Sequence, residues 1–456
     1  MIAGFGWSIE FKSAAMSIVV ASLVIATGSL ALAGGVTPGN GSNLPSALLP
    51  PPPGALQREL DEQKVEIPPQ SPGSSSLHLD AASSVVDVPF TYEGGHIIID
   101  VAIGGREHPF FLDSGATNIL THEVAGELGI EAHGYERLGG IGPQKTQASF
   151  ATIDKLQIGR IVLGAMPFRV TDLRNALVDR GSRPRIAGLV GAEFFNLFAV
   201  RIDYAKHVLR LTRRGMFHYD GQGIVLPLTL AFTRDHDAPL AAATIPATIE
   251  GAAGEFIIDT GSGGQVLLQP GFMDRQWLRS NYPSPLRFLG PGGIGGPLEM
   301  AMVLGGEISI GTMKLTRPLV TFAVAPNDLS LRRQYAGLIG NSLMQNFVVT
   351  IDFASQHLYL EPTGRTQLAR AIYGTGLFVD KPIHTEFEVI DVLHGSAAEA
   401  AGIRRGDRIV KIDGQPATDL GLSDFNALNG TPSHTSIDVG IDDGRLLTLR
   451  ISQILP

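Results

Sequence analysis

The sequence predicts a mainly β protein in which two homologous, barrel-like lobes are followed by a smaller α+β domain. Three observations support this prediction. An apolar strand followed by Asp, a hydroxyl residue and Gly occurs twice, at 110–116 and 256–262. A second apolar motif ending in Gly follows each copy after about 75 residues, at 187–191 and 336–340. Many short β-branched segments bounded by glycine favour an all-β architecture over a parallel sheet.

Length and composition limit the functional classes. The 456 residues leave room for about three domains. The net charge of −9 argues against a nucleic-acid-binding or polybasic membrane-surface protein. The chain has no cysteine, which excludes disulfides, cysteine zinc sites, thiol nucleophiles and a lipid-modified cysteine. We expect no cofactor and no metal, because His122-Glu123 lacks the second histidine of a zinc helix. A serine hydrolase is also poorly supported, because no Gly-x-Ser-x-Gly elbow is present.

The N-terminal segment predicts export. In residues 1–33, Lys12 precedes an apolar run, and Ala31-Leu32-Ala33 fits the small-residue cleavage rule. An uncleaved anchor is the alternative, since about 20 apolar residues can span a bilayer. Both readings place the rest of the chain outside the cytoplasm, in a bacterial periplasm or anchored facing it. Residues 34–85 are rich in Pro, Gly and Ser and are expected to be disordered. They serve as a tether or as a pro-segment over a cleft, and we favour the tether.

The two predicted lobes follow one plan. We place lobe one at 86–215 and lobe two at 222–362. The expected elements of lobe one are a hairpin at 94–115, a helix at 121–129, and strands at 151–158, 161–170 and 208–211. Lobe two begins in the same way, with strands at 242–249 and 255–259 around a Gly-Ala-Ala-Gly turn.

The repeated triplets, Asp113-Ser114-Gly115 and Asp259-Thr260-Gly261, are the candidate catalytic residues. A carboxylate at the end of a buried strand is costly unless a partner stabilises it, so two in equivalent places suggest that each is the other's partner. Two carboxyls that share a proton can activate water. The glycines let the backbone turn tightly, and the hydroxyls are expected to support the turn. A single triplet would more often be an ordinary capped turn, but two triplets within one repeated plan argue against that reading.

A glycine-rich string lies between the two motifs of each lobe. These strings contain Gly139-Gly140-Ile141 and Gly293-Ile294-Gly295. Their position favours mobile flaps that close over a bound peptide, and surface hairpins without function are the alternative. Phosphate binding is disfavoured, because neither string has the Lys of a P-loop or the spacing of a dinucleotide fingerprint.

Together, the three ordered matches resemble the retropepsin-like aspartic proteases of the pepsin/retropepsin superfamily, with both lobes fused in one chain over 86–362. The resemblance implies an aspartic endopeptidase that cleaves extended or unfolded polypeptides, with Asp113 and Asp259 as the catalytic pair. Ser114 stands where Thr is usual, and its hydroxyl can make the same cross-lobe bonds.

One chain supplies both aspartates, so we expect a monomer. Ser262 follows the second triplet where Ala116 follows the first, so we expect its hydroxyl to make Asp259 the more readily ionised member.

Residues 370–454 follow a different pattern. A strand at 387–392, an Ala-rich helix within 395–402, the strand motif at 406–409 and the Asp413-Gly414 turn resemble bacterial, protease-associated PDZ domains. Such domains bind C-terminal peptides by adding a strand to a sheet edge. Gly376, Leu377 and Phe378 are the expected peptide-binding residues. Substrate recruitment and regulation of the protease both remain open.

Two other functions remain open. The first is a non-catalytic peptide-binding or quality-control sensor with a vestigial dyad. The second is an enzyme whose only substrate is its own pro-segment. In every case the expected partners are polypeptides rather than nucleic acid.

Overall fold

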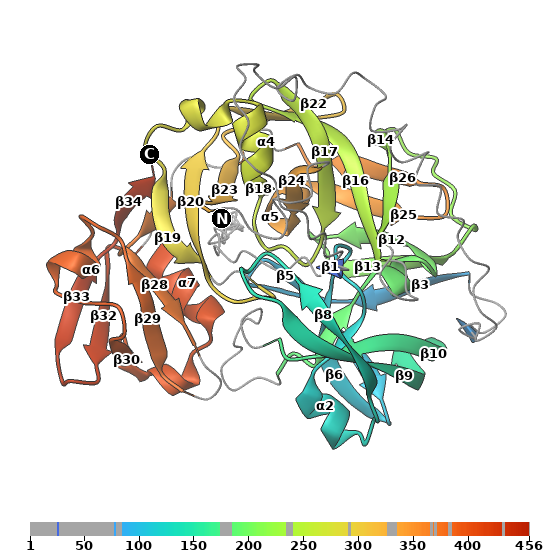
Figure 1. The fold of residues 1–456 in the computed structure, drawn as a ribbon, viewed down its shortest axis with the longest axis horizontal. Coiled ribbons are helices and arrows are strands. Elements are labelled where there is room, and N and C mark those ends of the chain that lie inside the picture. Colours follow the sequence, from blue (N-terminus) through green and yellow to red (C-terminus); the bar gives the residue numbers. More distant parts are fainter. Residues whose placement is uncertain are drawn as a thin grey trace, which may run out of the picture.

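The computed structural model describes residues 84–173, 185–233, 240–290, 293–325, 335–364, 368, 372–381, 385–430 and 434–455, with short strands at 25–26 and 77–78. Most of the predicted export signal and linker lies outside these residues. No helix of the described part is long and apolar enough to cross a membrane. Figure 1 shows two lobes joined side by side, with a smaller domain against the edge of the second lobe.

Lobe one is built on a ten-stranded sheet with the order β1-β8-β9-β10-β7-β11-β6-β5-β4, in which β2 pairs with β10. An additional pairing of β9 with β5 closes the sheet into a barrel. Its elements are β1 (Ile25–Ala26), β2 (Leu77–His78), β4 (Thr91–Glu93), β5 (His96–Ile103), β6 (Arg106–Leu112), β7 (Ile119–Leu120), α2 (His122–Glu127), β8 (His133–Gly139), β9 (Thr146–Ile158), β10 (Ile161–Val170), β11 (Gly188–Val190) and α3 (Ala192–Phe195).

Lobe two is built on a second ten-stranded sheet, β19-β20-β23-β18-β24-β17-β16-β21-β22, with β15 beside β16. Its elements are β15 (Thr229–Thr233), β16 (Leu240–Ile249), β17 (Ala252–Asp259), β18 (Val266–Leu268), α4 (Pro270–Arg275), the 3-10 helix η2 (Leu278–Asn281), β19 (Leu286–Gly290), β20 (Leu298–Leu304), β21 (Glu307–Ile310), β22 (Met313–Thr316), β23 (Leu319–Ala323), β24 (Tyr335–Gly340) and α5 (Asn341–Met344).

The strand orders of the two sheets show the internal duplication. The path β8-β9-β10-β7-β11-β6-β5 of lobe one repeats as β19-β20-β23-β18-β24-β17-β16 of lobe two. In both lobes the strand of the second motif lies parallel to the strand that leads into the triplet, as β11 beside β6 and β24 beside β17. The mainly β, two-lobed fold predicted from the repeated motifs is therefore confirmed.

A six-stranded sheet joins the lobes, with the order β14-β26-β25-β12-β13-β3. Its strands are β3 (Val85–Pro89), β12 (Phe198–Asp203), β13 (Val208–Arg213), β14 (Ile224–Pro227), β25 (Phe347–Asp352) and β26 (His357–Pro362). Strands β12 and β25 pair antiparallel, with Val200 opposite Ile351. Across this sheet Arg201 donates to both carboxylate oxygens of Glu361, at 2.6 and 2.9 Å. The sequence did not predict this shared sheet, which fixes one lobe against the other.

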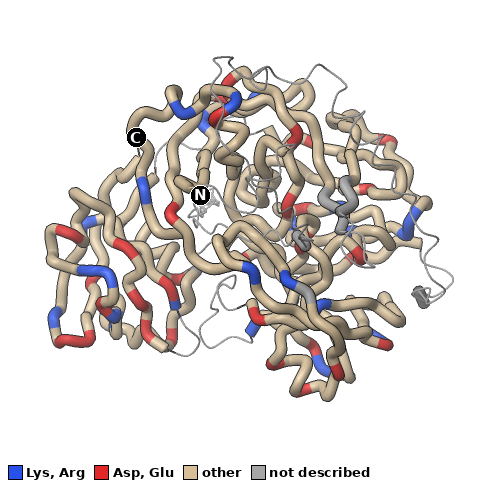
Figure 2. The backbone as a smooth tube through the Cα atoms, in the orientation of Figure 1, with Lys and Arg blue, Asp and Glu red and all other residues tan. Residues whose placement is uncertain are grey.

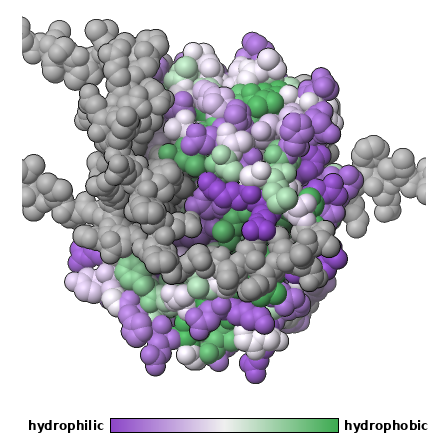
Figure 3. All heavy atoms as spheres, turned by 90° about the vertical axis from the view of Figure 1, so that its right-hand side faces the viewer, coloured by the Kyte–Doolittle hydropathy of each residue, from purple (hydrophilic) through white to green (hydrophobic). Residues whose placement is uncertain are grey.

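Apolar side chains of both lobes form one continuous core, which reaches from the first strands of lobe one to β26. Phe195 of lobe one and Phe353 of lobe two stack within it, with ring centroids 5.8 Å apart. The surface is mixed in character. Acidic and basic residues are scattered over both lobes and the smaller domain in Figure 2, and hydrophilic and apolar side chains are interspersed on the face shown in Figure 3.

The C-terminal domain has its own core and a sheet with the order β28-β29-β30-β32-β33. Its elements are β27 (Ile372–Gly374), β28 (Leu377–Asp380), β29 (Phe387–Val392), α6 (Ala397–Ala400), β30 (Arg408–Ile412), β31 (Gln415–Pro416), the 3-10 helix η4 (Ala417–Asp419), α7 (Leu422–Gly430), β32 (Ser436–Ile441), β33 (Leu446–Arg450) and β34 (Ser452–Leu455). The predicted Ala-rich helix is α6, and its N-cap Ser396 accepts a hydrogen bond from Glu399 N–H.

Candidate active site

The two triplets meet where β6 and β17 end. Asp113 follows β6, and its N–H donates to the carbonyl of Val190 in β11 at 2.9 Å. Asp259 is the last residue of β17 and lies opposite Gly340 of β24. Each second motif therefore packs directly beside its own aspartate. This explains why the two motifs recur as a set in each half of the sequence.

Four buried hydrogen bonds cross between the lobes at this point. The Ser114 hydroxyl donates to the carbonyl of Ile258 at 2.7 Å and accepts from Thr260 N–H at 3.0 Å. Reciprocally, the Thr260 hydroxyl donates to the carbonyl of Leu112 at 2.9 Å and accepts from Ser114 N–H at 2.8 Å. A serine therefore makes the same pair of bonds as the threonine of the other lobe. The four bonds hold the two triplets in fixed register.

The two carboxyls are enclosed, with exposures of 1 % for Asp113 and 0 % for Asp259. One oxygen of each accepts the N–H of the following glycine, Gly115 or Gly261, at 2.9 Å. The other oxygen of each has no other donor among the described residues, and the two carboxyls face each other. A Cβ on Gly261 would lie 2.2 Å from an Asp113 carboxylate oxygen, so only glycine fits at that position.

Burial separates the dyad from ordinary carboxyls. Burial raises the pKa of Asp113 to about 7, although hydrogen bonds from Gly115 and contact with Asp259 lower it. Burial also raises the pKa of Asp259 well above its usual value, and the Asp113 charge raises it further. Because the two groups titrate as a pair and burial raises the pKa of both, the arrangement favours keeping one proton between them.

The expectation that Asp259 ionises more readily rested on a hydrogen bond that the described residues do not make. That expectation assumed that the Ser262 hydroxyl would donate to the carboxylate. Instead, Ser262 acts on Asp259 through its backbone N–H, as Ala116 acts on Asp113, and its hydroxyl oxygen lies next to Gly340. The residue after the triplet consequently gives the two aspartates equivalent support.

The glycine-rich strings form the tips of two hairpins. Flap one is the β8–β9 hairpin with its tip at 139–142, and flap two is the β19–β20 hairpin with its tip at 293–296. The tips are bonded to each other, because Gly142 N–H donates to the Ile294 carbonyl at 3.0 Å. Each buried tip isoleucine packs into the apolar cluster of the opposite lobe: Ile294 lies in the cluster of Ala116, and Ile141 lies in that of Ile257. Since Ala116 directly follows the first triplet, the tip of flap two shares an apolar cluster with the first dyad loop.

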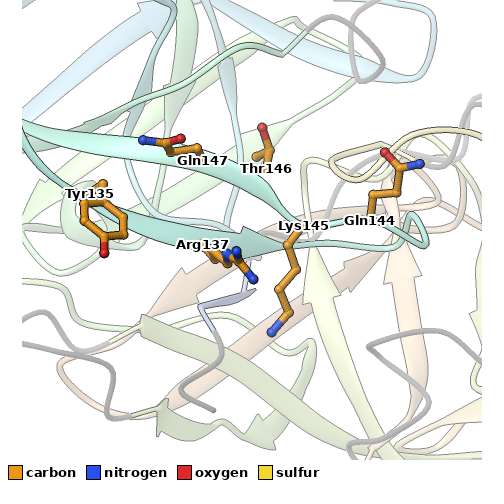
Figure 4. A pocket seen from close by; sticks show the side chains of 6 residues that line it. All are labelled: Tyr135, Arg137, Gln144, Lys145, Thr146 and Gln147. Atoms are coloured by element: carbon orange, nitrogen blue, oxygen red, sulfur yellow. The ribbon is translucent and has the colours of Figure 1, made fainter.

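A cavity of about 800 Å³ runs along flap one, lined by Tyr135, Arg137, Gln144, Lys145, Thr146 and Gln147. In Figure 4 the basic ends of Arg137 and Lys145 point the same way from the hairpin. The cavity lies on the outer part of the flap and contains neither aspartate. Sequence reasoning had assigned no role to these side chains.

Lobe one also contains a polar network beside the dyad that the sequence reasoning missed. Arg169, 3 % exposed, donates to the Thr117 hydroxyl at 2.6 Å, and that hydroxyl donates to Glu193. Asn118 N–H donates to the other Glu193 oxygen at 2.8 Å, and the Asn118 side chain accepts from Gly191 N–H at 2.7 Å. The network ties the chain after the first triplet to the helix after the second motif. The only sequence signal for this network is that Thr117 and Asn118 closely follow the first triplet and Glu193 closely follows the second motif.

Lobe two supports its triplet with neutral groups instead. The Asn341 amide donates to the carbonyls of Thr260 and Gly95, and its oxygen accepts from the Tyr204 hydroxyl at 2.7 Å. Gly95 and Tyr204 belong to lobe one, so Asn341 also links the lobes. Beside Gly95, His96 is 1 % exposed and stacks on Phe111, and burial lowers its pKa to about 4.

The predicted peptide-binding residues of the C-terminal domain lie at the start of β28. Gly376 has φ of +88°, and a Cβ there would lie 2.1 Å from the Ser396 Cβ, so the turn requires glycine. Leu377 is buried in the domain core. Phe378 points the other way and stacks on Phe288 of β19 in lobe two, with ring centroids 4.8 Å apart and planes 12° apart. The structure thus places only part of the predicted set toward the interior of the domain.

No cluster of His, Asp or Glu side chains that could hold a metal ion occurs among the residues with described positions. The two enclosed carboxyls of Asp113 and Asp259 are close enough to share one proton. A water molecule between them could be activated by the ionised member while the protonated member donates to a substrate oxygen.

Comparison with known proteins agrees with this architecture. Residues 99–194 match the family model described as aspartyl protease, and residues 372–441 match that of the PDZ domain. No curated protein matches the chain.

Two solved structures are similar to parts of the chain. An aspartic proteinase from Irpex lacteus is 14% identical, with 62% of this chain and 98% of that chain covered and a TM-score of 0.40. A retropepsin-like aspartic protease from Rickettsia conorii is 19% identical, with 31% of this chain and 93% of that chain covered and a TM-score of 0.20. The family models thus identify an aspartyl-protease-like region at residues 99–194 and a PDZ domain at residues 372–441.

Proposed function

We propose that the protein is an aspartic endopeptidase that hydrolyses peptide bonds in extended or unfolded polypeptides. The observation that carries the proposal is the set of four cross-lobe hydrogen bonds, which brings Asp113 and Asp259 together from separate lobes. The aspartyl protease family match, which includes Asp113, supports the same conclusion.

The proposed reaction uses the shared proton. The ionised carboxylate of Asp113 takes a proton from a water molecule as the water oxygen attacks the peptide carbonyl carbon. Asp259 gives its proton to the carbonyl oxygen, which produces a tetrahedral diol. Asp113 then gives its proton to the leaving nitrogen while Asp259 takes back a diol proton, so that the C–N bond breaks and the dyad regains its starting state.

The flaps are proposed to enclose the substrate. Their tips contact each other and bury apolar side chains, so a bound polypeptide must enter when they separate and is shielded from water when they close. A cleft closed by two hairpins favours an extended segment, because the backbone of a folded domain would not fit beneath them. The PDZ domain is proposed to bind carboxyl-terminal tails, either of substrates or of regulators.

The test is cleavage of casein, an unfolded protein, by the purified chain across acidic to neutral pH. Asp113→Asn and Asp259→Asn are tested in parallel, and circular dichroism confirms that both variants are folded. Cleavage by the wild type alone supports the shared dyad. Equal cleavage by either variant would refute it. If folded wild type leaves casein intact both with and without the PDZ domain, while still binding it, the non-catalytic peptide sensor becomes the better description.

We further propose that the protein works outside the cytoplasm as a monomer. The apolar segment within residues 1–33 supports export, and the presence of both aspartates in one chain removes the need for a dimer. Cell fractionation and light scattering test these two statements separately. Recovery in the cytoplasm would refute the first, and a constitutive dimer would refute the second.

A further inference from the structure

The PDZ domain touches lobe two at the stem of flap two. Phe378 of β28 stacks on Phe288 of β19, and the Asp391 carboxylate of β29 accepts the Leu289 N–H at 2.9 Å. Phe378 and Asp391 are direct cross-strand neighbours in the PDZ sheet. We call these four residues the PDZ–flap contact. In Figure 1 the orange PDZ strands lie directly beside the yellow strand β19.

The contact acts on the part of lobe two that must move. Strand β19 is the edge of its sheet and ends at Gly290, three residues before the flap tip begins. Asp391 thus occupies a backbone donor of an edge strand, and Phe378 covers an aromatic ring of the same strand. Ile372 and Leu455, from the paired strands β27 and β34, extend the contact into the same apolar cluster. The flap stem is therefore held by another domain, whereas its tip is held by flap one.

The same strand that makes this contact is the one to which a peptide would add. Strand β28 is the terminal strand of the PDZ sheet, and its outer edge pairs with no other strand of the described residues. A peptide joining that edge would alternate its side chains between the domain core and the face that carries Phe378. A bulge directly after Phe378 makes the strand adaptable at this point.

We propose that the PDZ domain restrains flap two and that a carboxyl-terminal peptide bound along β28 releases it. A ligand can shift an equilibrium only by making different contacts in its two states. Here the outward side chains of the peptide lie beside Phe378, and in the bound state they replace its contact with Phe288. Loss of that contact, and of the Asp391 bond next to it, frees the stem of flap two to open. In this scheme the carboxyl-terminal peptide regulates the peptidase site. The expected change in cleavage rate rests on the proposed peptidase function, whereas the release of flap two does not.

The experiment separates flap motion from catalysis. Hydrogen–deuterium exchange is measured over 286–304 in the full-length Asp113→Asn protein, which cannot turn over. The probes are decapeptides with a free carboxyl terminus ending in Ala, Val, Leu or Phe, and their carboxamides serve as controls. We expect a binding peptide to speed exchange in this hairpin several-fold, while its carboxamide has no effect.

Two variants test the contact without peptide. Phe378→Ala and Asp391→Ala in that background should speed exchange at flap two, and in the active protein they should raise basal kcat/KM several-fold and abolish the peptide response. Leu446→Ala, 75 % exposed at the opposite end of the PDZ sheet, and Glu388→Ala, exposed on β29, are matched controls that should change neither. If casein is not cleaved at all, the exchange measurements still decide the question of coupling.

Four results would overturn the proposal. One is a peptide that binds but leaves exchange at 286–304 unchanged. Another is a contact variant whose exchange and basal activity match those of its control. A third is failure of every free-carboxyl peptide to bind, which removes the ligand from the scheme. A fall in basal activity in Phe378→Ala would likewise reverse the proposed sign, because the contact would then support closure rather than restrain opening.

Discussion

Replacing Ser114 by alanine should cost both stability and activity, because this hydroxyl serves two buried backbone groups at once. Ser114→Ala removes the donor to the Ile258 carbonyl and the acceptor for the Thr260 N–H. Each buried group left without a partner costs about 1–3 kcal/mol, so the pair predicts a loss of about 3 kcal/mol after partial relaxation of the loops. For a two-lobed body of this size that loss lowers Tm by about 6–12 °C.

The matched control is Ser114→Thr, which keeps the hydroxyl and creates the residue found at the equivalent position of lobe two. We expect it to remain within about 1 kcal/mol of the wild type. Thr260→Ala should cost as much as Ser114→Ala, because its hydroxyl makes the reciprocal bonds to Leu112 and Ser114. The double variant should lose less than the sum of the two single losses, because the loops separate once either hydroxyl is gone.

The assay is thermal and urea unfolding followed by circular dichroism, with hydrogen exchange at the triplets to assign the transition to the lobes rather than to the PDZ domain. A loss below about 0.5 kcal/mol for Ser114→Ala would refute the reasoning, since two unsatisfied buried groups could not be so inexpensive. Strict additivity in the double variant would show that the two hydroxyls act independently.

Four further predictions concern the dyad, the flaps and the shared sheet. Asp113→Asn should stabilise the protein at pH 8 and not at pH 3: the folded pKa of this carboxyl is raised from 3.8 to about 7, so its contribution to stability is present below the unfolded pKa and is lost as pH rises through the folded pKa. The shift of about 3 units sets an upper limit of about 4 kcal/mol, which melting curves at the two pH values check, and equal shifts at both would contradict it. Because the pKa of Asp113 is raised to about 7, wild-type kcat/KM should fall as the pH drops below about 7, where the pair takes up its second proton. A pH–rate profile that stays flat down to pH 4 would argue against this. Ile294→Ala should raise KM about tenfold with a smaller effect on kcat, because the truncated tip loses its contacts in lobe one. Steady-state kinetics on a casein-derived peptide check this. An unchanged KM would mean that the tip does not close over substrate. Arg201→Ala should lower the free energy of unfolding by only about 1 kcal/mol, since its partner Glu361 is about one-third exposed. Urea unfolding measures this, and a loss above about 3 kcal/mol would contradict the reasoning from exposure.

The meeting of the two triplets could be predicted from the sequence because the residues that it requires are contiguous. A buried aspartate that must turn back on its own carboxylate needs glycine two positions later, and this constraint is visible within a few letters. The duplication then made the pattern specific. The PDZ domain was predicted for a similar reason, because its turns and its capped helix also lie in short, continuous segments.

The shared sheet and the polar networks could not be predicted in the same way. Strand β12 has a burial pattern that suits any neighbour, so nothing in its residues indicates that β25 of the other lobe is its partner. The network of Thr117, Arg169 and Glu193 joins residues that are 52 and 76 positions from Thr117, and each alone looks like an ordinary surface residue. The bond expected from the Ser262 hydroxyl to Asp259 is not made, because residue type alone does not set the direction of a hydroxyl.

The asymmetry between the lobes follows from their fusion. In a symmetric pair of separate subunits both halves would carry the same support, whereas here lobe one uses a charged network and lobe two uses Asn341. The PDZ domain likewise contacts the stem of flap two, whereas flap one is contacted by the tip of flap two. One contact can nevertheless influence both flaps, because Gly142 of flap one donates to Ile294 of flap two, so that flap one either moves with flap two or loses that bond. A single regulatory domain on one lobe can therefore act on an active site that two lobes build.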